Sequence, residues 1–141
     1  MEIKKVTNNE LSLLKNFLNK VKTFKDFDEE VLNNSSILLN DEKDIIGSIS
    51  LEQFESNGLI RYFIFYKNVE EEMINDLFLS LIDTAKDLKI KKLFSIVLND
   101  ESYYLFHKLN FETIKNERFF INDQNIKDLK DDSILIMKKE I

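Results

Sequence analysis

The stretch from Lys92 to Ile114 constrains the fold most, because a polar, capped segment separates two apolar runs. Residues 93–98, LFSIVL, are almost all apolar, which is typical of a strand buried on both faces. Asn99 predicts a helix N-cap, and the acidic residues after it suit the first turn, where the helix dipole favours them. Asn110 stands where this helix should end, in the left-handed conformation that asparagine tolerates. The stretch therefore predicts a strand, a short helix and another strand.

Apolar patterns predict the remaining elements. Thr7 and Glu10 have the spacing of a capping box, so a helix should open there. We expect strands at 3–6, 36–39, 45–54, 59–66 and 134–138, helices at 25–32 and 68–89, a strand reaching residue 121 and a polar loop through residue 132. The run LIRYFIFY at 59–66 is the most hydrophobic of these strands and should be central. Asn57-Gly58 predicts a hairpin turn before it.

Composition limits the class of protein. The chain of 141 residues is long enough for one domain, 1–141, with an apolar core. A formal net charge of −6 argues against nucleic acid as a partner, because phosphate contacts require excess positive charge. The sequence has no apolar run that could span a bilayer, no apolar segment behind MEIKK, no cysteine and no metal-ligand cluster. We therefore expect a cytoplasmic protein with no membrane partner and no metal.

The spacing after Asn99 resembles a known family signature. Ser102, Phe106, Asn110 and Phe111 follow it at 3, 7, 11 and 12 positions, as in the N-x-x-A-x-x-x-Y-x-x-x-G-F motif of the GNAT superfamily of N-acetyltransferases. The segments IGSI at 46–49, 77–90 and 134–139 are similar to that family's I-G-x-I strand, long helix and closing strand. The resemblance covers nearly the whole chain. It implies an α/β fold with a mixed, mostly antiparallel sheet and helices on both faces.

The resemblance also implies a reaction and a cosubstrate. Family members transfer an acetyl group from acetyl-CoA to a small-molecule or peptide amine, and many are homodimers. By this similarity, the backbone of Phe63, Ile64, Phe65 and Tyr66 would hydrogen-bond the pantetheine arm and polarise the thioester carbonyl. Asn99, the signature asparagine, would lie on the cofactor side.

In that family, the CoA pyrophosphate lies on a Q/R-x-x-G-x-G/A loop at the start of the long helix, where free N–H groups bind anions. The Arg and Gly positions of this loop correspond to Val69, Glu72 and Ile74, which all differ from the motif. Asn68 and Glu71 have capping-box spacing, so we expect the helix to begin after Asn68, with acidic residues in its first turn. A phosphate would then need other partners, such as Lys67 or a lysine of the helix.

The catalytic residues that the resemblance implies are also altered. The family's general acid, a tyrosine, corresponds to Phe106, which cannot donate a proton. Tyr103 and His107 share a helix face at i, i+4, and either can take this role. Glu52 is the candidate base for the acceptor amine. Two functions stay open at this point, a divergent N-acetyltransferase and a GNAT-fold binding or assembly module that has lost acyl transfer.

Overall fold

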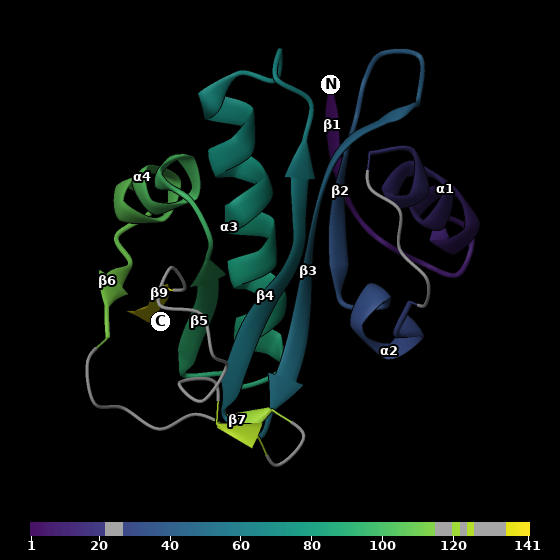
Figure 1. Ribbon diagram of the computed structural model, residues 1–141. Coiled ribbons are helices and arrows are strands. Elements are labelled where there is room, and N and C mark those ends of the chain that lie inside the picture. The colour runs from purple at the N-terminus through teal and green to yellow at the C-terminus, as the bar shows by residue number, and fades with distance from the viewer. Residues whose placement is uncertain (22–26, 115–119, 122–123, 126–134) are drawn as a thin grey trace.

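The computed structural model describes residues 1–21, 27–114, 120–121, 124–125 and 135–141 (Figure 1). Its strands are β1 (Glu2–Lys5), β2 (Ser35–Leu39), β3 (Ile45–Phe54), β4 (Asn57–Phe65), β5 (Lys92–Val97), β6 (Glu112–Thr113), β7 (Phe120–Ile121), β8 (Gln124–Asn125) and β9 (Leu135–Glu140). Its helices are α1 (Leu11–Val21), α2 (Glu29–Leu32), α3 (Glu71–Asp87) and α4 (Asp100–Lys108).

One sheet organises the molecule, with the strand order β1-β2-β3-β4-β5-β9-β6. β4 is the central strand, as its hydrophobic sequence predicts. Among the described strands, only β4 and β5 pair in parallel, and β9 runs antiparallel between β5 and β6. The expected mixed, mostly antiparallel sheet is therefore confirmed.

Helices cover both faces of this sheet, as expected (Figure 1). On one face, α3 packs on β1, β2 and β3 through a buried stripe that includes Leu77 and Leu81, and α4 adds Phe106 to the same cluster. On the other face, α1 and α2 pack on β3 and bury Leu14 and Leu32. The apolar repeat of each helix thus decides which side faces the sheet.

The prediction of a hairpin turn at Asn57-Gly58 is wrong. The hairpin turn is Glu55-Ser56, because Phe54 pairs with Asn57 and Glu55 takes the left-handed conformation with φ 56°. Gly58 lies inside β4, where a side-chain Cβ would come within 2.7 Å of Leu51 Cδ1. A glycine is therefore suited to this position because a side chain would crowd the core, and not because the chain turns here.

The start of α3 also differs from the prediction. The helix begins at Glu71 with Glu70 as its N-cap, and Glu70 makes no side-chain cap hydrogen bond. Val69 is buried, and its N–H donates to the Tyr66 carbonyl at 3.0 Å. This tight turn holds Asn68 outside the helix, so the predicted capping box with Asn68 does not form.

The other boundaries mostly agree with expectation. β3 has the predicted bounds, Asn99 caps α4, and Asn110 ends it with φ 69°. The helix expected at 25–32 is described from residue 27, and it forms only as α2, Glu29–Leu32. Residues 115–119 of the strand expected to reach 121, the polar loop from 126 to 132 and the first residue of the strand expected at 134 lie outside the described residues.

Candidate functional site

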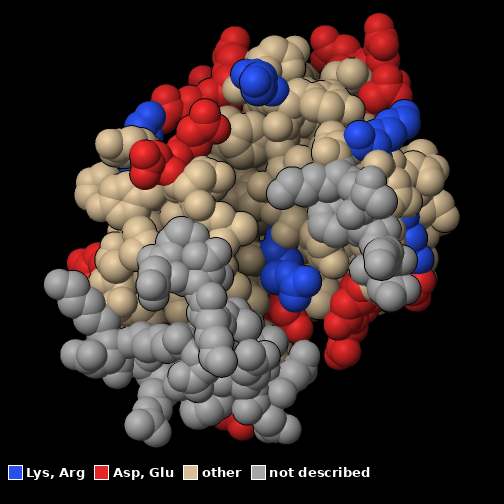
Figure 2. Space-filling model, viewed as in Figure 1, with Lys and Arg blue, Asp and Glu red and all other residues tan. Residues whose placement is uncertain are grey.

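The candidate site is a gap in the centre of the sheet. β4 and β5 pair at only three positions, from Asn57 with Lys92 to Leu59 with Phe94, although β4 continues to Phe65. Beyond these pairs, the two parallel strands diverge at their carboxyl ends. Figure 2 shows a hollow in the middle of this face of the molecule, with mainly uncharged atoms around it. In open α/β sheets, ligands bind outside the carboxyl ends of parallel strands, and this gap has that position.

A bulge in β4 lies at this gap. Ser48 pairs with Ile64 and Ser50 pairs with Arg61, so β4 has one extra residue in this interval. Tyr62 lies there with φ 50°, the left-handed conformation that costs a non-glycine residue about 1 to 3 kcal/mol. The buried Ser48 hydroxyl donates to the Tyr62 carbonyl at 2.8 Å and holds the bulge from β3. Strain of this kind is often found at functional sites.

The ladder between β3 and β4 determines which backbone groups of β4 face the gap. The Tyr66 N–H donates to the Ile46 carbonyl at 3.1 Å, and Ser48 pairs with Ile64. Because alternate residues of an antiparallel strand bond to its partner, the backbone of Ile64 faces β3, whereas that of Phe65 faces the gap. In the regular ladder past the bulge, Phe65 is therefore the residue of the predicted cofactor-binding segment whose main chain this alternation directs into the gap.

A row of phenylalanine rings connects β4 to α4 and α3. Phe63 contacts Phe65 and Phe106 with ring centroids 5.7 and 5.8 Å apart, and Phe106 contacts Phe111 at 5.0 Å. Phe106 is 5% exposed and is held edge-to-face by these neighbours. The ring at the signature tyrosine position thus belongs to the core beside the gap.

The predicted acid candidates on α4 differ in their surroundings. Tyr103 is half-buried and packs against the apolar cluster that contains Phe106, whereas His107 is exposed. Their rings stack with centroids 5.9 Å apart. Asn99, at the start of α4, accepts the Ser102 N–H at 2.8 Å, so its side-chain oxygen serves as a cap. Tyr103 is therefore the candidate that packs on the apolar cluster beside the gap.

Glu52 lies on the opposite face of the sheet from these residues. Leu51 belongs to the cluster under α3, so the next side chain of the strand points the other way. There, Glu52 Oε1 accepts a hydrogen bond from Arg61 Nη1 at 2.7 Å. The Arg61 guanidinium also lies 5.3 Å from the centre of the Tyr62 ring. The structure thus joins Glu52 to Arg61, and it brings Glu52 together with neither Tyr103 nor His107.

The first turn of α3 offers main-chain donors near α4. Within the described part of the chain, the N–H groups of Glu71 and Glu72 have no hydrogen-bond partner. Lys108 of α4 reaches this turn and pairs with Glu71 at 2.9 Å. A cavity of about 290 Å³ lies here, lined by Glu71, Glu72, Ile74, Asn75, Leu105, Lys108 and Leu109. Lys108 was not among the residues predicted by number, because only the fold brings it beside α3.

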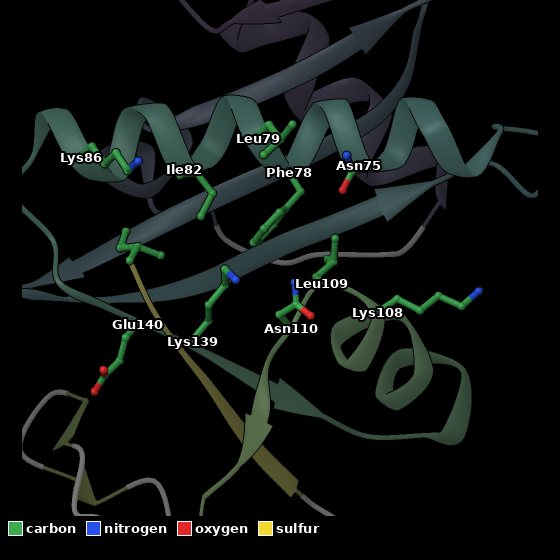
Figure 3. Close-up of a pocket in the computed structure, with 11 residues that line it drawn as sticks. Asn75, Phe78, Leu79, Ile82, Lys86, Lys108, Leu109, Asn110, Lys139 and Glu140 are labelled. Atoms are coloured by element: carbon green, nitrogen blue, oxygen red, sulfur yellow. The ribbon is translucent and has the colours of Figure 1, made fainter.

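A second cavity of about 250 Å³ lies further along α3 (Figure 3). It shares Asn75, Lys108 and Leu109 with the first cavity, and Lys86 and Lys139 also line it. In Figure 3, Phe78 and Ile82 point from α3 toward the side of the cavity formed by α4 and β9. The two cavities therefore follow the boundary between α3 and α4, and three lysines and Glu140 contribute charges to the lining of the second one.

Among the described residues, no group of three or more His, Cys, Asp or Glu side chains is arranged to hold a metal ion. No helix among the described elements is long and apolar enough to cross a membrane.

No protein-family model and no curated protein sequence matches the chain. Solved structures do match it. N-acetylglutamate synthase from Neisseria gonorrhoeae, complexed with coenzyme A and L-arginine, superposes with a TM-score of 0.76 and 17% identity over 99% of this chain. The chain spans about a third of that protein, 33% of its length.

Two shorter proteins match over nearly their whole length. A GNAT family acetyltransferase from Elizabethkingia anophelis with acetyl-CoA bound has a TM-score of 0.70 and 16% identity, covering 99% of this chain and 97% of that one. Rv2747 from Mycobacterium tuberculosis in complex with CoA and NLQ has a TM-score of 0.75 and 12% identity, covering 100% and 99%. The chain therefore has the GNAT fold, and these identities establish the fold alone.

Proposed function

We propose that this protein is an N-acetyltransferase that transfers an acetyl group from acetyl-CoA to a primary amine. The observation that carries the proposal is the gap where β4 and β5 diverge, next to a strained bulge in β4. Structurally similar proteins bind coenzyme A or acetyl-CoA, as their names state. In the proposal, the thioester lies in the gap, where main-chain groups of the Phe65 region polarise its carbonyl.

Side chains among the described residues are candidates for the base that accepts the ammonium proton and for the acid that protonates the thiolate. The amine nitrogen attacks the thioester carbon, the C–S bond breaks, and an amide and free CoA form. Glu52, acting through water, would take the proton that the ammonium must lose before attack. Tyr103 would protonate the departing thiolate, because it is half-buried beside the aromatic row and carries a hydroxyl. His107 is the second candidate acid, stacked on the Tyr103 ring.

The first turn of α3 supports binding of the CoA phosphates. The N–H groups of Glu71 and Glu72, which have no partner in the described part of the chain, suit an anion at a helix N-terminus, and Lys108 adds a positive charge there. The lysines along the second cavity suit the rest of the polyanionic cosubstrate. The carboxylates of the first turn oppose this binding, so we expect weaker affinity than a glycine-rich loop would provide.

Isothermal titration calorimetry with acetyl-CoA and with CoA tests the binding step. Micromolar to high-micromolar dissociation constants are expected, and no heat at millimolar ligand would contradict the proposal. A screen of amines then follows CoA release. In that assay, Tyr103→Phe should lower kcat by about 100-fold with little change in KM, as expected for loss of a general acid. His107→Gln should have a smaller effect if Tyr103 is the acid.

A second candidate function is a GNAT-fold binding or assembly module. The observation that favours it is the contact between Phe63 and Phe106, which fills the position where the family has a tyrosine. Glu70, Glu71 and Glu72 at the start of α3 favour it as well, because they repel phosphate. Absence of CoA binding in both wild type and a Glu70→Lys, Glu72→Gly variant would support this module, because repulsion would then not be the cause.

A further inference from the structure

The ion pair between Glu52 and Arg61 lies beside the proposed reaction site. It joins neighbouring strands β3 and β4 on the face opposite α3, and Arg61 precedes the bulge residue Tyr62. The Glu52 side chain is only 14% exposed, whereas the Arg61 side chain is 38% exposed. The carboxylate is thus largely enclosed, while the guanidinium remains accessible to a ligand.

Arg61 is held in a fixed orientation but retains hydrogen-bonding capacity. One Nη1–H group donates to Glu52, and the planar group lies over the Tyr62 ring. A guanidinium has five N–H donors, and within the described residues those of Arg61 have no other protein acceptor. Likewise, Oε2 of Glu52 accepts no hydrogen bond from a described residue. An arginine oriented in this way can bind a carboxylate through two parallel hydrogen bonds.

From this arrangement we infer that the acceptor is a free α-amino acid, bound as a zwitterion by Arg61 and Glu52. The inference rests on the proposed acetyl transfer. The carboxylate of the acceptor would bind Arg61, and its ammonium group would bind Glu52. In an α-amino acid, the ammonium and carboxylate groups are both attached to the same carbon. Their short separation suits the side chains of Glu52 and Arg61, which are in direct contact. Polyamines and peptide N-termini lack the carboxylate at that position.

The same geometry supplies the first proton transfer. The ammonium nitrogen gives a proton to Glu52, directly or through water, and the neutral amine attacks the thioester carbon. The new C–N bond replaces the C–S bond, the thiolate receives a proton from Tyr103, and the remaining amine proton leaves to solvent. Arg61 takes no part in bond breaking and acts as a specificity residue for the carboxylate.

The first test uses the wild-type protein and sets of matched acceptors. Each set contains an L-amino acid, its carboxamide and the amine that remains after decarboxylation, and initial rates of CoA release give kcat/KM. We expect the acid to exceed both analogues by about 10- to 100-fold, the range for charge-assisted hydrogen bonds. Equal or faster reaction of the carboxamides or amines would overturn the inference while leaving acetyl transfer intact.

A second test uses variants. In Arg61→Gln, the preference for the acid over its carboxamide should fall to within about threefold, and Arg61→Lys should retain part of it because it keeps the charge but not the fork. Lys43→Gln is the control, because Lys43 lies in the turn before β3 and forms an exposed ion pair with Glu2 that does not involve Arg61. A purely structural role for Arg61 would lower both rates together and leave their ratio unchanged, which would also refute the inference.

Binding measurements separate failure of this inference from failure of the proposed function. Saturation-transfer NMR with each matched set, without CoA, reports acceptor binding even if no transfer occurs. Amino acids that bind to wild type but not to Arg61→Gln would support the inference in the absence of catalysis. If carboxamides bind as well as acids, or if neither binds, the inference is wrong whatever the result with acetyl-CoA.

Discussion

At the scale of single residues, Ser48 has a larger role than its size suggests. Its buried hydroxyl donates to the Tyr62 carbonyl and so holds a strained segment of β4 at the edge of the gap. The sequence pattern I-G-S-I does not reveal that this serine has a different role from any other small residue in a strand. Its role depends on the bulge in a neighbouring strand.

Ser48→Ala should lower the free energy of unfolding by about 1 to 2 kcal/mol, because the substitution removes a buried hydroxyl and its hydrogen bond to the Tyr62 carbonyl. It should also weaken acetyl-CoA binding, since the bulge is then free to relax. Ser36→Ala is the matched control, because it removes a buried hydroxyl that bonds Ser80 under α3, away from the gap. Urea unfolding and calorimetry compare the two. An equal loss of CoA affinity in both variants would contradict the role given to Ser48.

Glu10 provides a prediction about pH. Its buried carboxylate pairs with Lys4 at 2.9 Å and accepts hydrogen bonds from Thr7, and these contacts lower the pKa of Glu10. The stabilisation from this group is therefore complete above its unfolded pKa of about 4.3 and is lost as pH falls through the lower folded value. Glu10→Gln should cost about 1 to 2 kcal/mol at pH 7 and progressively less below pH 4.

Urea unfolding at pH 7, 5, 4 and 3 measures this difference. Glu2→Gln serves as a control, because its partner Lys43 is exposed and such surface pairs contribute little. If the difference in free energy of unfolding between wild type and Glu10→Gln stays constant down to pH 3, the charge of Glu10 is not responsible for it.

At the scale of elements, local patterns predicted the structure where local interactions determine it. Asn99 caps α4 through its own side chain, and β3 ends where its apolar run ends. The predictions failed where distant parts of the chain decide. Gly58 is explained by Leu51, Leu93 and Ile90, which leave no room for a side chain, and no turn rule includes that information.

The prediction of where α3 starts failed for a related reason. Asn68 has suitable capping-box spacing. However, Val69 is buried and its N–H donates to the Tyr66 carbonyl, so Asn68 lies in a turn and not at the helix N-cap. As a result, the N–H groups of Glu71 and Glu72 have no partner among the residues that the structure describes. For the site, the sequence indicated the central strand and the α4 candidates. It did not indicate the pairing of Glu52 with Arg61 or of Glu71 with Lys108, because each contact depends on the fold.

The unpartnered first turn of α3 leads to a prediction about its charges. Glu71→Gln should strengthen CoA binding by about 3- to 10-fold, because it removes one repelling carboxylate and releases Lys108 from its ion pair. Lys108→Gln should weaken binding. Glu42→Gln, in the turn between β2 and β3, changes the net charge equally and should have no such effect. Calorimetric dissociation constants that do not separate Glu71→Gln from Glu42→Gln would contradict this prediction.

At the scale of the whole molecule, the charge distribution affects how an anion approaches. The formal net charge is −6, and Figure 2 shows acidic side chains gathered over the end of the molecule where α3 begins. An anionic ligand therefore meets a repulsive field before it reaches the lysines. Added salt screens this field over distances of about 10 Å at 0.1 M.

The association rate of acetyl-CoA should accordingly rise when NaCl increases from 20 to 200 mM, the reverse of the trend for a basic binding site. Stopped-flow measurement of binding at several salt concentrations tests this expectation. A rate that falls with salt would mean that the lysines at the cavities dominate the field that the ligand encounters.

The position of β9 between β5 and β6 has a consequence for synthesis of the chain. Both neighbours leave the ribosome before the strand that separates them, whereas β1 to β4 can pair in the order in which they emerge. Until residues 135–140 have been translated, one side of β5 remains an unpaired edge, and Phe94 lacks its cover from Ile136. The nascent protein thus carries an incomplete sheet until late in translation, and that unpaired edge can pair with another chain in the meantime.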